Sequence, residues 1–351
     1  MKFLYALLIF VPIAVAAELL HWNPLIVFGA SMLAIVPLAK AMGTATEEIA
    51  LRTGPGIGGL LNATFGNATE LIIAFFALNA GLYKVVQASI TGSIIGNILF
   101  VLGLAIFLGG WKYPTQTFNR TVAGLNTSML ILAVIGLIIP AGFVATSPGV
   151  DPGLLHKLSI VVSVFLILAY VANLVFALRT HTDLYAGGEG QHDHHEAPTM
   201  TMRTAIGLLL GSTIAVAFMA EFLVGSITHV TETLGWSEMF IGVILVPIIG
   251  NAAEHLTAVT VALKNKMDLS LGIAIGSTTQ IALLIAPVLV LTGAAIGKPL
   301  TLGFDHFEVL SVVMAVAIAN FIVLDGESNW LEGLMLLITY AILAVAFFFH
   351  P

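Results

Sequence analysis

Residues 66–78 read GNATELIIAFFAL, and residues 250–263 read GNAAEHLTAVTVAL. Each stretch opens an apolar run with Gly and Asn and places a Glu three residues after the Asn. That step puts the amide and the carboxyl group on one face of a helix, one turn apart. An ionisable side chain inside an apolar run is costly in a membrane, so the pattern indicates a functional position that occurs twice.

The whole chain has the composition of a membrane protein. Of its 351 residues, 59% are hydrophobic and only 9% are charged, and the mean hydropathy is +1.05. The formal net charge is -7 and no basic cluster points to nucleic acid. With no Cys, thiolate metal sites and disulfides are excluded. We expect a lipid bilayer around the protein and no cofactor.

Apolar runs of about 20 residues match a hydrocarbon core of about 30 Å. We predict an all-α polytopic protein with eleven transmembrane helices, at residues 3–20, 24–46, 58–80, 86–110, 119–140, 155–179, 204–230, 239–264, 269–295, 305–324 and 330–349. The first run is interpreted as a retained helix because it has no clear signal-peptide cleavage site.

A shift of 184 residues superimposes the two motifs, and with them other polar and glycine positions. The aligned pairs are Gly66 with Gly250, Asn67 with Asn251, Glu70 with Glu254, Glu48 with Glu232, Gly58 with Gly242, Gly92 with Gly276 and Ser93 with Ser277. Each copy holds five predicted spans. Because five is odd, the copies cross the membrane in opposite directions, and inverted repeats of this kind are typical of secondary transporters.

The predicted organisation is therefore one extra helix followed by two repeats. Residues 1–20 form the extra N-terminal helix, 21–179 the first five-helix repeat, 180–203 a linker and 204–351 the second repeat. The linker carries four histidines among acidic residues, namely His181, His192, His194 and His195. A weak metal sensor is one interpretation. A flexible linker is favoured because its glycines oppose a preorganised cage.

Lys and Arg are expected to concentrate in the cytoplasmic loops. A cytoplasmic N-terminus places nine of the twelve inside and leaves three outside, namely Lys84, Lys157 and Lys298. The C-terminus then faces the exterior and the linker lies in the cytoplasm. The localisation expected from these features is a cell membrane, and a homo-oligomer is left open.

The paired motifs predict a cation site near the middle of the membrane. Two carboxylates, two amide oxygens and backbone carbonyls approach the about six to eight hard oxygen ligands that Ca²⁺ takes. Gly66 and Gly250 interrupt their helices, and broken helices free carbonyls for cations. The expected ligands are Gly66, Asn67, Glu70, Gly250, Asn251 and Glu254. The competing interpretation of a Gly-Asn step is a helix-packing notch.

The two glutamates also predict proton coupling. Burial disfavours an uncompensated carboxylate, so Glu70 and Glu254 are expected to hold protons when the cation is absent. One Ca²⁺ and two protons neutralise the same two charges. If only the loaded forms allow the protein to reorient, this competition becomes exchange.

Other polar residues receive weaker assignments. The predicted side walls and neighbours of the site are Ser93, Asn97, Ser277, Gln280 and His255. Glu221 and Glu308 fall inside predicted spans and either line a path or pair with a polar neighbour. Glu47, Glu48 and Arg52 are interpreted as a solvated helix end.

The stretches TEEIALRTGPGIGGLLNATFGNATELIIA (46–74) and IGNAAEHLTAV (249–259) resemble the repeat motifs of the calcium/proton exchangers, a branch of the cation/calcium exchanger superfamily. The resemblance covers essentially the whole chain. It implies a Ca²⁺/H⁺ antiporter whose ions bind at Asn67, Glu70, Asn251 and Glu254, with Ser277 and Gln280 on the following helix. It also implies that His255 is typical of this branch.

Several alternatives stay open at this point. One is a sodium/calcium exchanger of the same fold, although GNATE and GNAAEH supply no obvious extra Na⁺ ligands; another is an exchanger of Mn²⁺ or other divalent cations for protons. An intramembrane metalloprotease is disfavoured because the His-Glu-x-x-His order is absent. A passive channel is disfavoured by matched halves around buried carboxylates.

Overall fold

The computed structural model describes residues 2–53, 55–147, 149, 151–182, 184 and 198–350. Nearly all of these residues are helical. Strand structure in the described part is limited to two short antiparallel segments, β1 (Gln116–Thr117) and β2 (Glu327–Ser328), in which Gln116 pairs with Ser328. The chain forms two compact units, one from residues 1–89, 196–253 and 348–351, the other from 90–195 and 254–347.

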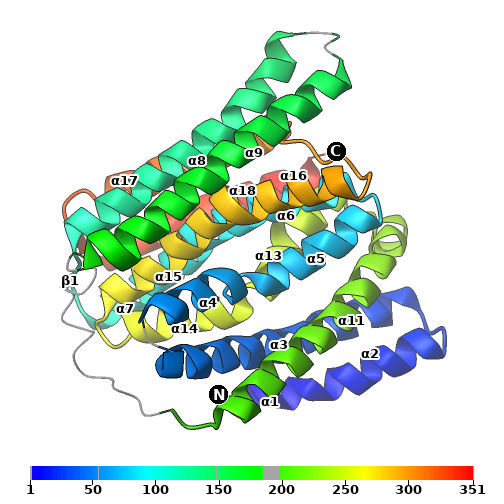
Figure 1. Ribbon diagram of the computed structural model, residues 1–351, viewed down its shortest axis with the longest axis horizontal. Coiled ribbons are helices and arrows are strands. Elements are labelled where there is room, and N and C mark those ends of the chain that lie inside the picture. Colours follow the sequence, from blue (N-terminus) through cyan, green and yellow to red (C-terminus); the bar gives the residue numbers. More distant parts are fainter. Residues whose placement is uncertain are drawn as a thin grey trace. The chain divides into compact units, whose positions relative to one another are not determined.

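The first unit is centred on two long helices, α3 (Pro24–Thr53) and α11 (Met202–Leu234), which lie side by side (Figure 1). Thr201 begins α11 by accepting a hydrogen bond from the Thr204 N–H at 3.2 Å, and Gly235 ends it in a left-handed conformation. The other elements of this unit are α1 (Lys2–Ala6), η1 (Leu7–Ile9), α2 (Phe10–Leu19), α4 (Pro55–Phe65), α5 (Ala68–Asn79), α12 (Glu238–Phe240), η4 (Ile241–Leu245) and α13 (Val246–Gly250).

The second unit contains a long hairpin of α8 (Arg120–Thr146) and α9 (Pro152–Val175), visible in Figure 1 as a green pair. Asp151 caps α9 ahead of a proline at its first position, a favourable helix start. The other elements are η2 (Gly96–Val101), α7 (Leu102–Lys112), η3 (Phe176–Thr180), α15 (Met267–Gln280), η5 (Ile281–Ile285), α16 (Ala286–Ala295) and α17 (His306–Ile322). Helices α14 (Ala252–Ala262) and α18 (Trp330–Phe349) lie mostly in this unit, and α6 (Tyr83–Ile95) is divided between the two units.

The bounds of the helices recur along the chain at the 184-residue offset. Adding 184 to α5 gives 252–263, and α14 covers Ala252–Ala262. The same addition to α6 gives 267–279, and α15 covers Met267–Gln280. The π-helical segment η2 maps to 280–285, where η5 is again π-helical. These two helix pairs and this one π-helical segment therefore recur at the offset.

Seven helices in the described residues are long and apolar enough to cross a membrane, or eight if the pair Glu238–Gly250 and Ala252–Ala262, bent by 61°, is one span. Three shorter apolar helices cover Leu4–Leu19, Ala68–Asn79 and His306–Ile322. The span predicted at 58–80 is interrupted at residues 66–67, where the sequence predicts a break at Gly66. Each of the eleven predicted ranges contains apolar helix.

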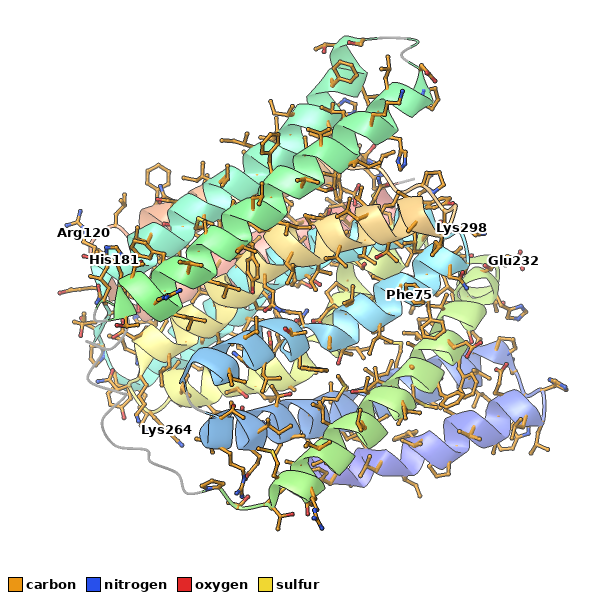
Figure 2. All side chains as sticks on the ribbon, viewed as in Figure 1. Phe75, Arg120, His181, Glu232, Lys264 and Lys298 are labelled. Carbon is orange, nitrogen blue, oxygen red and sulfur yellow. The ribbon has the colours of Figure 1, made fainter. Side chains whose placement is uncertain are left out.

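Basic residues of the second unit gather at one end of its helices. Figure 2 shows Arg120, at the start of α8, His181, which follows η3, and Lys264 toward the same end of this unit. Lys298 lies at the opposite end (Figure 2). The linker histidines His192, His194 and His195 lie outside the described residues.

Helices α7 and α18 cross with their backbones almost in contact. A Cβ atom on Gly333 would lie 2.2 Å from the Phe107 amide nitrogen, and one on Gly103 would lie 2.9 Å from the Leu336 Cβ. Small residues let membrane helices approach this closely and gain van der Waals contact. Glycine is required at Gly333 because the clashing atom belongs to the backbone.

We expect Gly333→Ala to destabilise the protein by about 1–3 kcal/mol, since the new methyl group forces the two helices apart. The measurement is the thermal unfolding midpoint of purified protein in detergent. Gly124→Ala is the matched control, because a Cβ there meets nothing within 4 Å. An unchanged midpoint for Gly333→Ala would contradict the tight crossing.

Candidate cation-binding site

The first motif lies at a helix interruption in the first unit. Helix α4 ends at Phe65 and α5 begins at Ala68, so Gly66 and Asn67 form the interruption. Asn67 has non-helical backbone angles, φ -105° and ψ 25°, and its side chain does not cap α5. It is nevertheless only 1% exposed. The structure therefore places this amide in the protein interior, at the break between two helices.

Glu70 packs against the interruption in the second motif. A Cβ atom on Gly250 would lie 3.2 Å from the Glu70 Cγ and 3.4 Å from its Cδ. Helices α5 and α13 are in contact, and Glu70 is 7% exposed. The first unit thus brings the carboxyl group of one motif to the glycine of the other. Gly250 leaves the space that this carboxyl group occupies.

Asn251 marks the bend between α13 and α14. It is 1% exposed, and its Nδ2 donates to the Pro247 carbonyl at 3.3 Å. Proline has no N–H and disturbs the preceding turn, so it leaves carbonyls without helical partners nearby. The predicted residues Gly66, Asn67, Glu70, Gly250 and Asn251 all belong to the first unit.

Glu254 belongs to the second unit, where its neighbours were also predicted from sequence. Its carboxyl group is hydrogen-bonded to the Ser277 side chain. Asn97 Nδ2 donates to the Ser277 Oγ at 3.0 Å, and His255 Nε2 lies 3.2 Å from the Asn97 Oδ1. The structure therefore joins four predicted residues, which come from α14, η2 and α15.

Two further predicted residues are buried in the second unit. Ser93 lies on α6, one turn before Asn97, and is 2% exposed. Gln280 is the last residue of α15 and is 7% exposed. Buried polar side chains next to π-helical segments are consistent with functional positions, because such segments are frequent at functional sites.

The remaining acidic residues have different surroundings. Glu308 forms a capping box with Asp305 at the start of α17, and Thr91 donates to its Oε1 at 3.2 Å. Glu308 is therefore a helix-capping residue. Of the two roles considered from the sequence, lining a path or pairing with a polar neighbour, the structure shows the second. Glu221 is exposed on α11.

The interpretation of Glu48 as part of a solvated helix end is wrong. Glu48 is 6% exposed, and its two oxygens accept from the Thr199 N–H at 3.0 Å and the Met200 N–H at 3.2 Å. Arg52 also donates to the Met200 carbonyl. The end of α3 therefore holds the chain where it enters α11. Glu47 and Arg52 are exposed, as expected.

A resident metal centre is not evident in the described residues, where no group of three or more His, Cys, Asp or Glu side chains gathers. The ligands predicted from the sequence instead combine carboxylate, amide and carbonyl oxygens. Such a donor set is hard and suits Ca²⁺ rather than a soft metal.

The chain matches the sodium/calcium exchanger protein family over residues 23–179 and 204–349. It belongs to that family. The matched ranges leave out the linker and the first helix, and they correspond closely to the two predicted repeats. Membership in this family makes the protein a transporter rather than an enzyme.

Similar proteins make the relationship more specific. The chain is 51% identical to the Ca²⁺/H⁺ antiporter of Synechocystis sp., over 100% of this chain and 98% of that protein. It is 46% identical to the Ca²⁺/H⁺ antiporter ChaA of Bacillus subtilis, over 96% of each chain. The solved structure of native YfkE superimposes with a TM-score of 0.86 at 42% identity, covering 99% of this chain and 100% of that one.

Sequence reasoning about this exchanger missed two features of the site region. The capping box could have been found, because Asp305 and Glu308 show the acidic-x-x-Glu spacing of that motif. The connection of Asn97 to both His255 and Ser277 carries no local signal, since these residues are 158 and 180 positions from Asn97.

Proposed function

We propose that this protein is a secondary antiporter that exchanges Ca²⁺ for H⁺ across a membrane. The observation that carries the proposal is the position of Glu70, a buried acid packed on the helix break of the second GNA motif. Such a contact between the motifs of the two halves is what a shared cation site requires. Close relatives named Ca²⁺/H⁺ antiporters support the same activity.

The ligands we propose are Asn67, Glu70, Asn251 and Glu254, with the carbonyls of Gly66 and Gly250. The support is the sequence symmetry that pairs these residues and the burial of both asparagines and Glu70. Two carboxylates balance the charge of one Ca²⁺. When the cation leaves, two protons restore neutrality, because an uncompensated charge in a low-dielectric interior is costly.

We propose eleven spans, one extra helix and two inverted five-helix repeats. The recurrence of helix bounds and of π-helical segments at 184 residues supports the repeat. In transporters built this way, one repeat moves against the other around a midplane site and exposes it alternately to each side. Proton-loaded and Ca²⁺-loaded forms then carry the two ions in opposite directions.

The orientation we propose has a cytoplasmic N-terminus and an exterior C-terminus in a prokaryotic cell membrane. Its support is the excess of Lys and Arg in the loops assigned to the cytoplasm. The gathering of Arg120 and Lys264 at one end of the second unit, away from Lys298, agrees with it (Figure 2).

The test is transport by purified protein in liposomes. With an imposed pH gradient, acidic inside, we expect Ca²⁺ to accumulate and the lumen to lose protons, because each Ca²⁺ replaces protons on Glu70 and Glu254. A Ca²⁺-sensitive and a pH-sensitive dye read the two fluxes. Collapsing the gradient with a protonophore and weak base is the control.

Replacing the pH gradient with a Na⁺ gradient separates this function from sodium/calcium exchange. Uptake that follows Na⁺ and ignores pH would contradict the proposal. Running Mn²⁺ in place of Ca²⁺ under the same pH gradient measures whether other divalent cations share the site.

A further inference from the structure

Four residues of the second unit form a continuous hydrogen-bond chain: His255, Asn97, Ser277 and Glu254. The Nε2 of His255 lies 3.2 Å from the Asn97 Oδ1, Asn97 Nδ2 lies 3.0 Å from the Ser277 Oγ, and Ser277 reaches the Glu254 carboxyl group. The two ends of the chain are neighbours on α14, and its middle residues come from η2 and α15. The series of hydrogen bonds therefore begins and ends on α14.

The chemistry of the side chains sets the direction of this chain. A carboxamide oxygen can only accept, so the His255 Nε2 must donate to Asn97. Because Asn97 Nδ2 donates to the Ser277 oxygen, the hydroxyl hydrogen of Ser277 is available to donate to Glu254. Every donor in the chain thus points toward the carboxyl group.

Asn97 occupies the middle of this hydrogen-bond chain. Its amide oxygen bonds to His255, and its amide nitrogen bonds to Ser277. It is 2% exposed, so water does not compete for its polar atoms. At the end of the chain, the Oε2 of Glu254 is buried and has no hydrogen-bond partner among the described residues. One carboxylate oxygen is thereby held by the protein while the other is left for a ligand.

We infer that Asn97 is a positioning residue, which aims the Ser277 hydroxyl at Glu254 and so presents one oxygen of that carboxyl group to the transported cation. This inference rests on the proposed function. It assigns Asn97 and His255 to the support of a ligand rather than to the coordination of Ca²⁺.

The residues of this hydrogen-bond chain are not all repeated in the sequence at the 184-residue offset. Asn97 corresponds there to Ile281 and His255 corresponds to Leu71. Neither aliphatic side chain can donate or accept a hydrogen bond. The support through Asn97 is therefore assigned to Glu254 alone.

The experiment is a double-mutant cycle of Asn97→Leu and Ser277→Ala in the liposome assay, reading the apparent Ca²⁺ KM and the maximal rate separately. Leu branches at Cγ as Asn does, and it cannot form the hydrogen bonds of the chain. Each single variant is expected to raise KM by roughly tenfold, because a buried partner loses its hydrogen bond. The double variant should be no worse than the poorer single variant, since both interrupt one chain.

Ser270→Ala is the matched control, because it removes another fully buried hydroxyl from α15 that lies outside the chain. It should keep the wild-type KM. His255→Phe should raise KM less than Ser277→Ala, since it retains the ring beside Phe100 and leaves Asn97 bonded only to Ser277. If Asn97→Leu does not fold, Asn97→Ser, too short to bridge both partners, takes its place with the same expectation.

Wild-type KM in the single variants, or effects that multiply in the double variant, would overturn the inference while the proposed function stands. If the wild-type protein shows no exchange driven by pH, the proposed function fails instead. The Ca²⁺-induced rise in thermal unfolding midpoint then tests the chain by itself, and an equal rise in wild type and Ser277→Ala would count against it.

Discussion

Glu70→Gln is expected to abolish Ca²⁺ uptake driven by a pH gradient. The amide keeps the shape of the side chain, which packs against Gly250, but removes one of the two charges proposed to balance Ca²⁺. Breaking a buried ion pair from one side costs about 3–5 kcal/mol. This corresponds to a loss of affinity of roughly 150- to 5,000-fold. The initial rate of Ca²⁺ accumulation in liposomes is the measurement.

Glu327→Gln is the matched control for this variant. Glu327 is an exposed residue of the short strand β2, so its neutralisation should leave the uptake rate unchanged. The Glu70→Gln variant also cannot release a proton at position 70, so its coupled proton efflux should disappear together with its Ca²⁺ flux. Uptake at the wild-type rate in Glu70→Gln would remove the basis of the proposed site.

Gly250→Val is the second change with a large expected effect. Even the Cβ of Ala would lie 3.2 Å from the Glu70 Cγ, and the methyl groups of Val extend about 1.5 Å beyond that position. The Glu70 side chain must then move away from the second motif. Overpacking costs about 1–3 kcal/mol, so we expect the Ca²⁺ KM to rise by roughly 5- to 150-fold.

The matched control is Gly207→Val, on an exposed face of α11 where a Cβ meets nothing within 4 Å. It introduces the same β-branched residue into a helix without approaching Glu70. Size-exclusion chromatography verifies that both variants fold. A Gly250→Val protein that folds and transports with the KM of the control would show that the space beside Glu70 is not needed for cation binding.

Much of the fold could be predicted because its signals are local. Apolar runs mark the helices, and the interruptions at Gly66 and Gly250 follow from the residues themselves, since Gly adopts non-helical conformations easily. The 184-residue repeat predicted which helix bounds would recur, and α5 and α14 show it.

The surroundings of individual acids could not be predicted in this way. Glu48 and Glu308 both look like acids at helix ends, and both are buried. Glu48 is held by Thr199 and Met200, about 150 positions away. The packing of α3 against α11 selects these partners. No spacing pattern along the sequence predicts which loop residues will lie near Glu48.

The sequence by itself determined that this is a helical membrane protein, and it identified a motif with Asn and Glu that occurs twice. It could do so because apolar length, helix breakers and a repeated motif depend on residues within a few turns. The tertiary structure decided that Glu70 lies against Gly250 and that Asn97 links His255 to Ser277. Those contacts join residues 158 to 180 positions apart, so only the packing of the helices could select them.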